Sequence, residues 1–251
     1  MTQTSSAATT VNAGDFRVGV VIGRSRSMLW RHFPSFLVVG LISSSPILLQ
    51  TFTQTVELPD EEILSPLLWL IFILVSLMVF TTFGQAVVIH AAFQGMRRGR
   101  VRLVESLNVA LRSFWPLIGL ALAGLLILVG LILLIVPGLI LSTLWFVVLP
   151  ACVVEQLGPW TSLRRSRELT RGHRWKVLGL TVLLMIGTFV GGSVIESWVT
   201  AATSPTVGVV SDWMWTAIWT AFTATITIVT YHELRVAKEG TDIDQITGVF
   251  D

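Results

Sequence analysis

Six long apolar runs dominate the sequence, and shorter segments rich in charged or turn-forming residues separate them. A helix that crosses a membrane needs about 20 mostly apolar residues, and each run meets or approaches that length. The runs cover residues 33–52, 63–90, 116–136, 139–154, 177–198 and 209–231. This pattern predicts an all-α, polytopic membrane protein with about six transmembrane helices.

The third and fourth runs form one uncharged stretch that is too long for a single crossing. Pro137 and Gly138 divide it, and proline followed by glycine is typical of a turn, so we expect a tight hairpin of two crossings there. The fourth run is short and contains Pro150. A re-entrant segment is therefore the alternative interpretation of this run.

Basic residues occur on only one side of the predicted helices. They lie in residues 17–31, 97–112, 164–176 and 235–238, whereas the intervening segments hold Asp and Glu but no Lys or Arg. Short loops rich in Lys and Arg stay in the cytoplasm. The pattern therefore predicts an even number of crossings with both termini cytoplasmic.

Three short basic segments precede the first, third and fifth runs. They are residues 15–31, 101–115 and 159–175. In the second of them, Leu103, Leu107 and Leu111 share one face of a helix while Arg102, Glu105 and Arg112 lie elsewhere, as in a helix that lies in the headgroup plane. We expect three cytoplasmic interfacial helices, and their order with the runs suggests a weak threefold repeat of interfacial helix plus hairpin.

The composition agrees with a membrane protein. Apolar residues make up 53% of the chain and charged residues 13%, whereas globular proteins carry about 25% charged residues. The mean hydropathy is +0.77, and the net charge of +2 is too small for a nucleic-acid binder. The domains that we expect are a disordered tail over 1–14, one membrane domain over 15–234, and a cytoplasmic tail over 235–251 with a short amphipathic helix.

No motif of a known catalytic or metal-binding site occurs in the sequence, so we expect no cofactor, no metal and no enzyme activity. The four histidines nevertheless fall near the predicted cytoplasmic ends of helices, together with several glutamates. Such a rim is the kind of place where acid–base chemistry could assemble. The simpler interpretation is that polar residues lie where helices meet water. These histidines are His32, His90, His173 and His232.

Four arginines in the third basic segment have helical spacing. Arg164, Arg167, Arg171 and Arg174 follow one another at intervals of three and four residues, which would align them along one stripe of a helix. Guanidinium groups bind phosphate oxygens in a bidentate manner. The stripe is a candidate site for anionic lipid headgroups, and the alternative is that these charges only fix the topology.

Five threonines have the same kind of spacing in the last run, and they would share one helix face. Such a face could line a polar path. In membrane helices, small hydroxylated residues more often serve close packing, which we favour here. These residues are Thr216, Thr220, Thr223, Thr227 and Thr230.

The second half of the chain resembles a known bacterial family. The stretch around Pro137-Gly138, the segment RRSRELTRG and the ending YHELRVAKEGTDIDQITGVFD are similar to the glycerophosphoryl diester phosphodiesterase membrane domain. In longer proteins of that kind, the membrane module is joined to a catalytic barrel, which this chain lacks. The resemblance therefore implies a multi-pass module of the bacterial plasma membrane and does not carry the activity over.

These observations lead to one favoured function and two alternatives. We expect a non-catalytic membrane module that organises lipid or a partner protein at the cytoplasmic face, with anionic membrane lipids as its main partners. A protein partner or a second copy of the chain is a further expected contact, and nucleic acid is not. The alternatives are a channel or transporter subunit and an intramembrane enzyme that acts on lipid-derived phosphodiesters.

The predicted orientation can be tested by labelling introduced cysteines with a reagent that does not cross membranes. Cysteines at Thr55 and Ser204 should react in intact cells, because both lie in segments without Lys or Arg. A cysteine at Ser166 should react only after permeabilisation. Reaction at Ser166 in intact cells would reverse the orientation.

Overall fold

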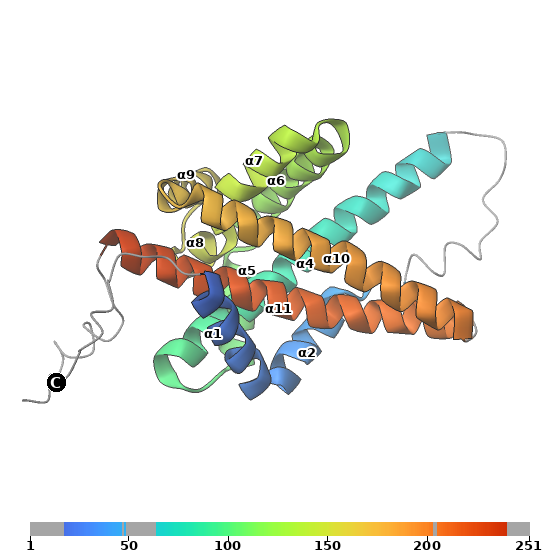
Figure 1. Ribbon diagram of the computed structural model, residues 1–251, viewed down its shortest axis with the longest axis horizontal. Coiled ribbons are helices and arrows are strands. Elements are labelled where there is room, and N and C mark those ends of the chain that lie inside the picture. The colour runs from blue at the N-terminus through green and yellow to red at the C-terminus, as the bar shows by residue number, and fades with distance from the viewer. Residues whose placement is uncertain (1–17, 47, 49–63, 203–204, 240–251) are drawn as a thin grey trace, which may run out of the picture.

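The fold was obtained as a computed structural model, which describes residues 18–46, 48, 64–202 and 205–239. All regular secondary structure in these ranges is α-helical (Figure 1). The predicted tail over 1–14, the acidic segment near Thr55, the position Ser204 and the amphipathic helix after residue 240 lie outside the described residues. The helices are α1 (Val18–Arg31), α2 (Phe33–Ser43), α4 (Leu64–Arg98), α5 (Leu103–Arg112), α6 (Phe114–Leu133), α7 (Ile135–Leu144), α8 (Val148–Glu155), α9 (Pro159–Thr170), α10 (Arg174–Ala202) and α11 (Pro205–Glu239).

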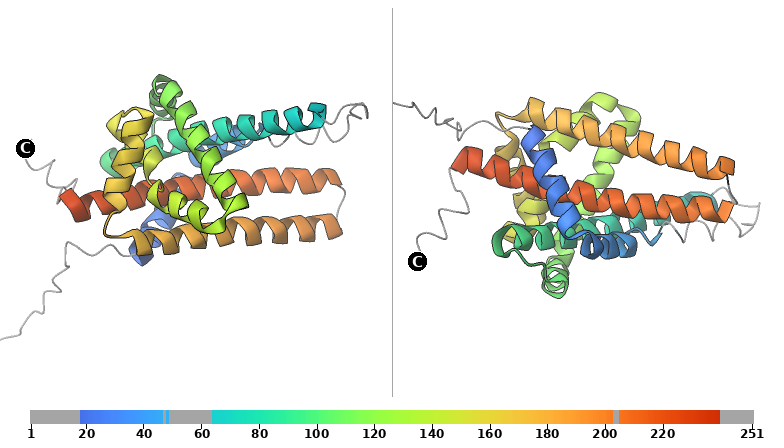
Figure 2. Two further views of the ribbon diagram at one scale, coloured as in Figure 1. Left: turned by 90° about the horizontal axis from the view of Figure 1, so that it is seen from above. Right: turned by 60° about the horizontal axis from the view of Figure 1, so that its bottom comes forward.

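The last helix, α11, is the centre of the bundle. It packs against α1, α2, α4 and α10, and the three longest helices, α4, α10 and α11, run beside one another in the views of Figure 2. Ala217, Ala221 and Ala224 are buried along it, followed by Ile228 and Leu234. Small residues let neighbouring backbones approach closely, which explains why one helix can contact so many others.

Four helical segments in the described part of the chain are long and apolar enough to cross a membrane. They are Ile71–Arg97, Phe114–Leu133, Ile135–Glu155 and Arg174–Val199. α11 is less apolar than these segments, because threonine and tryptophan occupy many of its positions. Since neighbouring helices cover α11, its side chains face mainly protein, and a strongly apolar surface is not required of it.

The first predicted crossing, 33–52, does not form one continuous helix. α2 ends at Ser43 after 11 residues, which corresponds to about 16 Å and is too short to cross a membrane. The hydroxyls of Ser43 and Ser44 both donate to the carbonyl oxygen of Gly40, at 3.0 and 2.8 Å. Such bonds compete with the helical backbone pattern, and Pro46 follows without an N–H group.

The predicted hairpin of the third and fourth runs is present, but its turn lies earlier than expected. α6 ends at Leu133 and Leu134 is extended, with φ −149° and ψ 97°. Pro137 lies within the first turn of α7, where proline is tolerated. Gly138 lies against α6, since a Cβ atom there would be only 2.7 Å from the carbonyl carbon of Gly130. Gly138 therefore serves the packing of the two helices, and neither Pro137 nor Gly138 forms the turn.

The hairpin does not lie parallel to the long helices. α6 crosses α4, α10 and α11 steeply (Figure 2), and the turn between α6 and α7 lies level with the middle of α10 along the length of the bundle (Figures 1 and 2). The chain bends again after α7, so that the predicted fourth crossing is divided into α7 and α8. The segment Ile135–Glu155 remains long enough in total to cross a membrane.

A short helix precedes each of α2, α6 and α10, at the three places where interfacial helices are predicted. α1 buries Val21, Ser25 and Leu29 against the bundle. α5 buries the small residues Ser106 and Ala110 and leaves Val104, Leu107 and Leu111 exposed, whereas Leu103 is half-buried. Leu107 and Leu111 of the apolar face predicted for the second short segment are therefore directed outward.

Two glycines of α10 receive the two stacked tryptophans of α11. A Cβ atom at Gly187 would be 2.5 Å from Cζ2 of Trp219, and one at Gly191 would be 2.8 Å from Cη2 of Trp215. The two indole rings stack at 5.3 Å between centroids, and Nε1 of Trp219 donates to Oγ1 of Thr188 at 2.7 Å. The GxxxG spacing in α10 thus forms two sockets for large aromatic side chains.

The Gly187→Ala variant should lower the melting temperature of the purified protein in detergent, because the new methyl group displaces Trp219 from its socket and breaks its bond to Thr188. Gly179→Ala is the matched control in the same helix, where nothing lies within 4 Å of the added Cβ. The control should keep or slightly raise the melting temperature, since alanine favours the helix. Equal melting temperatures for both variants would contradict the socket.

Candidate functional site

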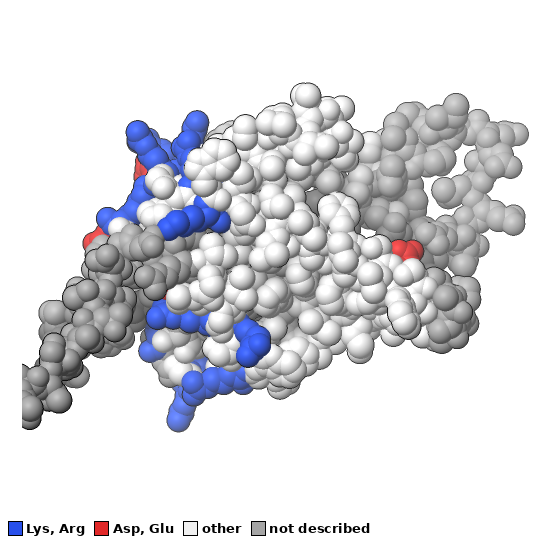
Figure 3. Space-filling model, in the orientation of Figure 1, with Lys and Arg blue, Asp and Glu red and all other residues white. Residues whose placement is uncertain are grey.

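Lysine and arginine gather at one end of the molecule, which we call the basic end (Figure 3). α1, the loop between α4 and α5, α9, the start of α10 and the end of α11 all contribute basic residues to it. On the face that Figure 3 displays, the opposite end carries an acidic spot and no basic side chain. The separation of charge along the bundle agrees with the distribution that the sequence predicts.

The four arginines of the predicted stripe lie together at the basic end, although not on one helix. Arg164 and Arg167 belong to α9, Arg171 caps its end and Arg174 begins α10. α9 ends because the next residue, Gly172, has a φ of +95°, a conformation that glycine adopts far more easily than other residues. All four side chains are exposed. We call this group the arginine surface.

The arginine surface is largely free of internal ion pairs. Arg164 pairs with Glu168 at 3.1 Å within α9, and both groups are exposed, so this pair is weak. The other three arginines form no ion pair with any acidic side chain that the structure describes. Trp160 and Trp175, with exposed fractions of 83% and 85%, flank the surface. Guanidinium groups beside exposed indoles are typical of a membrane interface.

The opposite side of α9 holds the helix against the bundle. Nε of Arg165 donates to both carboxylate oxygens of Glu155 in α8, at 3.0 and 3.1 Å. The hydroxyl of Tyr231 in α11 donates to the same carboxylate at 2.6 Å. The hydroxyl of Ser166 donates to the carbonyl oxygen of Leu144 at 2.9 Å. These bonds join α7, α8, α9 and α11, and they turn the arginine surface outward.

This network extends to the end of α11. The guanidinium of Arg165 also pairs with Glu239, and Nε of Arg235 donates to Glu239 at 2.8 Å. Burial alone would raise the pKa of Glu239, but the hydrogen bonds from Arg235 and Arg165 outweigh it and lower that pKa. Arg24 of α1 pairs with Glu233 of α11. The sequence gives no signal for the pairs of Arg165 with Glu239 and of Arg24 with Glu233 beyond the presence of charges near helix ends, because these partners lie far apart along the chain.

The structure does not assemble the histidines into a metal site. In the described residues, no group of three His, Cys, Asp or Glu side chains is placed to hold a metal ion. Nδ1 of His90 lies 3.1 Å from the hydroxyl of Ser106 in α5, and Oε1 of Gln94 accepts from the backbone N–H of Arg102 at 3.1 Å. These contacts of α4 hold α5 in place.

The threonines of the predicted stripe lie along α11. Thr220 and Thr230 are buried, whereas Thr216, Thr223 and Thr227 are half-buried. Thr223 donates to the carbonyl oxygen of Thr220 at 3.0 Å, and Thr227 donates to that of Thr223 at 2.7 Å. A hydroxyl that donates to a carbonyl oxygen of its own helix no longer offers its proton to a neighbouring helix or to a polar path. This geometry favours the packing interpretation over a polar path.

The fold and the basic end define an all-α protein whose apolar helices are suited to a membrane. The chain belongs to the family described as a domain of unknown function (DUF7847), whose pattern matches residues 109–234, which is half of the chain. The match begins within α5 and ends in α11, so it includes the hairpin, the arginine surface and the central helix. No curated protein and no solved structure matches the chain.

The lowered pKa of Glu239 predicts an acid-sensitive contact at the basic end. A carboxylate with a lowered pKa stabilises the fold above its ordinary pKa of 4.5, and this contribution is lost as the pH falls through the lowered value. The melting temperature in detergent should therefore fall as the pH drops below about 4.5, and Glu239→Gln should make the fall smaller. Glu168→Gln, which removes an exposed carboxylate of α9, is the control and should leave the pH dependence unchanged.

Proposed function

We propose that this protein is a non-catalytic module of the bacterial plasma membrane that organises anionic lipid at its cytoplasmic face. The observation that carries the proposal is the arginine surface: four exposed guanidinium groups from α9 and the start of α10, flanked by Trp160 and Trp175. Each basic residue near an anionic leaflet contributes ~1 kcal/mol. Because the network around Glu155 fixes α9 to the bundle, these groups reach the lipid headgroups without having to order a flexible segment.

In the proposed topology the basic end faces the cytoplasm, and α4, α10 and α11 cross the membrane together with the segment that includes α2. The hairpin of α6 and α7 enters and leaves from the cytoplasmic side. Its turn lies level with the middle of α10 along the length of the bundle (Figure 2), and the five residues around it are apolar and 65% to 73% exposed. The N–H groups of Leu134 and Gly138 are bonded to carbonyl oxygens, at 2.9 and 3.3 Å.

This topology keeps an even number of crossings but replaces two of the six predicted ones with a re-entrant hairpin. The order of elements, a short helix before α2, before α6 and before α10, supports the proposed threefold repeat. In the repeat, the middle unit would enter the membrane without crossing it. The resemblance to the glycerophosphoryl diester phosphodiesterase membrane domain is compatible with this arrangement and stays a prediction.

The cysteine-labelling experiment uses Thr161 in place of Ser166 and adds a cysteine at Leu134. Ser166 is fully buried, so a cysteine there would not react from either side, and the exposed Thr161 of α9 replaces it. In a Cys152→Ala background, a cysteine at Thr161 should react only after permeabilisation. A cysteine at Leu134 should stay unreactive to an impermeant reagent in intact cells. Reaction at Leu134 from outside would favour two full crossings over the re-entrant hairpin.

The double variant Arg164→Ala, Arg171→Ala should weaken binding of the purified protein to anionic vesicles of phosphatidylglycerol. Two lost contributions of ~1 kcal/mol each correspond to roughly 30-fold weaker binding at low salt. The measurement is a titration of the protein, held in a nanodisc of neutral lipid, with the vesicles.

Arg26→Ala, Arg112→Ala is the control, because it removes the same charge from exposed positions outside the arginine surface. It should weaken the binding less than the test variant does. If the test variant binds as tightly as the parent protein, the arginines only fix the topology and the proposed function is wrong. Vesicles of phosphatidylcholine should show no difference between the variants.

A further inference from the structure

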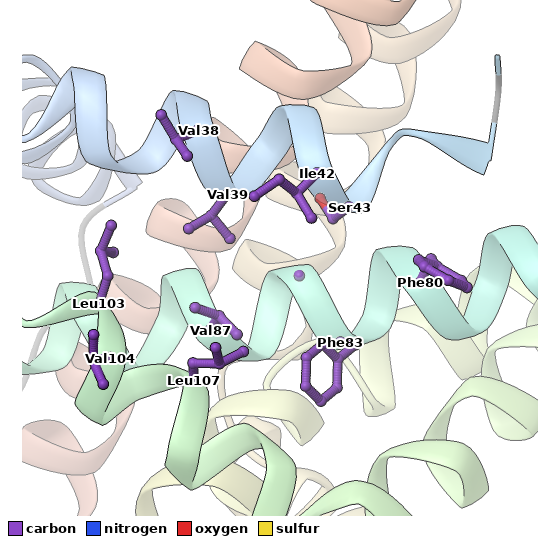
Figure 4. Close-up of a pocket in the computed structure, with 11 residues that line it drawn as sticks. Val38, Val39, Ile42, Ser43, Phe80, Phe83, Val87, Leu103, Val104 and Leu107 are labelled. Carbon is purple, nitrogen blue, oxygen red and sulfur yellow. The ribbon is translucent and has the colours of Figure 1, made fainter.

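A groove of about 340 Å³ runs between α2, α4 and α5, away from the arginine surface. Val38, Val39 and Ile42 of α2 form one wall, and Phe80, Phe83 and Val87 of α4 form the other (Figure 4). α5 closes the end with Leu103, Val104 and Leu107. A volume of this size is at the small end of the ~300–1,000 Å³ that is usual for ligand pockets.

The groove offers almost no hydrogen-bonding group to an occupant. Among the described residues that line it, Ser43 has the only polar side chain, and the hydroxyl of Ser43 already donates to the carbonyl oxygen of Gly40. A peptide in this groove would leave its backbone N–H and C=O groups without partners, at a cost of ~1–3 kcal/mol for each. A hydrocarbon chain has no such groups, so the lining favours an acyl chain.

The groove is open along the side of the bundle. Val38, Ile42 and Phe80 line it and have exposed fractions of 50%, 65% and 49%. On α5, Val104 and Leu107 are exposed while the small Ser106 packs inward, where its hydroxyl donates to the carbonyl oxygen of Arg102 at 3.1 Å. In the proposed topology this side of the bundle faces the lipid, so an acyl chain reaches the groove without any opening of the fold.

The end of the groove at α5 lies at the basic end of the protein. Arg102 directly precedes the lining residue Leu103 and caps α5. The junction of α1 and α2 meets the same loop, because a Cβ atom at Gly95 would be 3.4 Å from Cγ2 of Val101 and 3.6 Å from Nε2 of His32. Arg31 adjoins His32 in the sequence and is exposed, as is Arg102.

Within the described residues, Arg31 and Arg102 have no acidic partner. A groove with an apolar lining that ends at α5, which Arg102 caps, and near the junction of α1 and α2, which carries Arg31, matches the shape and charge of an amphiphile with an anionic head. Guanidinium groups bind phosphate oxygens well, and a phospholipid carries such a phosphate head together with acyl chains.

We propose that the groove binds one acyl chain of a membrane phospholipid whose anionic headgroup lies against Arg31 and Arg102. The proposal rests on the membrane location in the proposed function and adds a second, separate lipid site. At the arginine surface lipids are held by charge alone, whereas at the groove one lipid is held by both its chain and its head. The groove should therefore retain a single lipid for longer than the rest of the surface does.

The test uses phosphatidylglycerol with a photoreactive diazirine near the middle of one acyl chain, added to the full-length protein in nanodiscs. After irradiation, the labelled residues are identified by mass spectrometry. Labelling should concentrate on Ile42, Phe80 and Leu107 over exposed apolar residues elsewhere, such as Leu68 with an exposed fraction of 57%. Equal labelling of all exposed apolar residues would overturn the proposal, and so would cross-links between two copies of the chain in place of lipid adducts.

Leu107→Trp fills the groove and should lower labelling at Ile42 and Phe80 at least roughly fivefold, a change of about 1 kcal/mol in occupancy. Leu111→Trp is the matched control, one turn further along α5. Leu111 is similarly exposed, at 52% against 43% for Leu107, but it does not line the groove. If both variants lower labelling equally, or if neither does, the groove is not the site.

The headgroup contact is tested with Arg31→Gln, Arg102→Gln. Loss of two charges should reduce labelling of the groove by phosphatidylglycerol about tenfold or more, and labelling by the phosphatidylcholine analogue should change little. Arg112→Gln, at the other end of α5, is the control. Unchanged labelling by phosphatidylglycerol in the double variant would overturn the proposed headgroup site.

Failure of this proposal is distinguishable from failure of the proposed function. Arg164→Ala, Arg171→Ala should weaken vesicle binding but leave labelling of the groove intact. If vesicle binding is unaffected while the groove is still labelled and still blocked by Leu107→Trp, the arginine surface has no lipid role and the groove stands.

Discussion

The burial of α11 among α1, α2, α4 and α10 is the constraint on which the rest of the structure depends. A helix surrounded in this way must present small residues wherever a neighbour comes close, and it must hide its polar groups. Gly40 of α2 meets the backbone of Ala217, where a Cβ atom would lie 2.5 Å from the carbonyl oxygen. Trp215 and Trp219 enter glycine sockets on α10. Thr223 and Thr227 direct their hydroxyls to carbonyl oxygens of α11 itself.

The ion-pair network at the basic end follows from this central helix. Glu155 accepts from Tyr231 of α11 and from Arg165 of α9, so its charge, which is largely withdrawn from water, has partners on two sides. The same contacts fix the orientation of α9 relative to α11. Because Arg165 faces inward, the arginines at positions 164, 167 and 171 face outward. The arginine surface is thus the outer side of a helix whose inner side is fixed by charge.

The two proposed lipid sites use different physical principles at opposite flanks of the basic end. The arginine surface has charge and exposed indoles but no groove, so it suits many headgroups held weakly. The groove between α2, α4 and α5 has an apolar lining and only two nearby arginines, so it suits one lipid held by its chain. Together they would order the inner leaflet around the protein. In both cases a short helix that precedes an apolar segment supplies part of the site.

Much of the fold could be predicted from the sequence, because hydrophobic periodicity and helix-ending residues act locally. The apolar runs gave the positions of α4, α6, α10 and α11. Local signals failed where a bend depends on neighbouring helices. Pro137-Gly138 looked like a turn, yet the close approach of Gly138 to Gly130 places both residues inside α7. The end of α2 at Ser43 was missed, since the apolar pattern continues beyond it.

The candidate sites likewise combine features that the sequence predicts with features that depend on tertiary contacts. The sequence by itself determined the number and sidedness of the arginines and the helical character of their segment, because charge and periodicity are properties of the chain. Only the tertiary structure decided that Arg165 turns inward to Glu155 and that α5 closes a groove between α2 and α4. These features need contacts between residues far apart in the sequence, and no local pattern specifies which distant side chain will fill a given space.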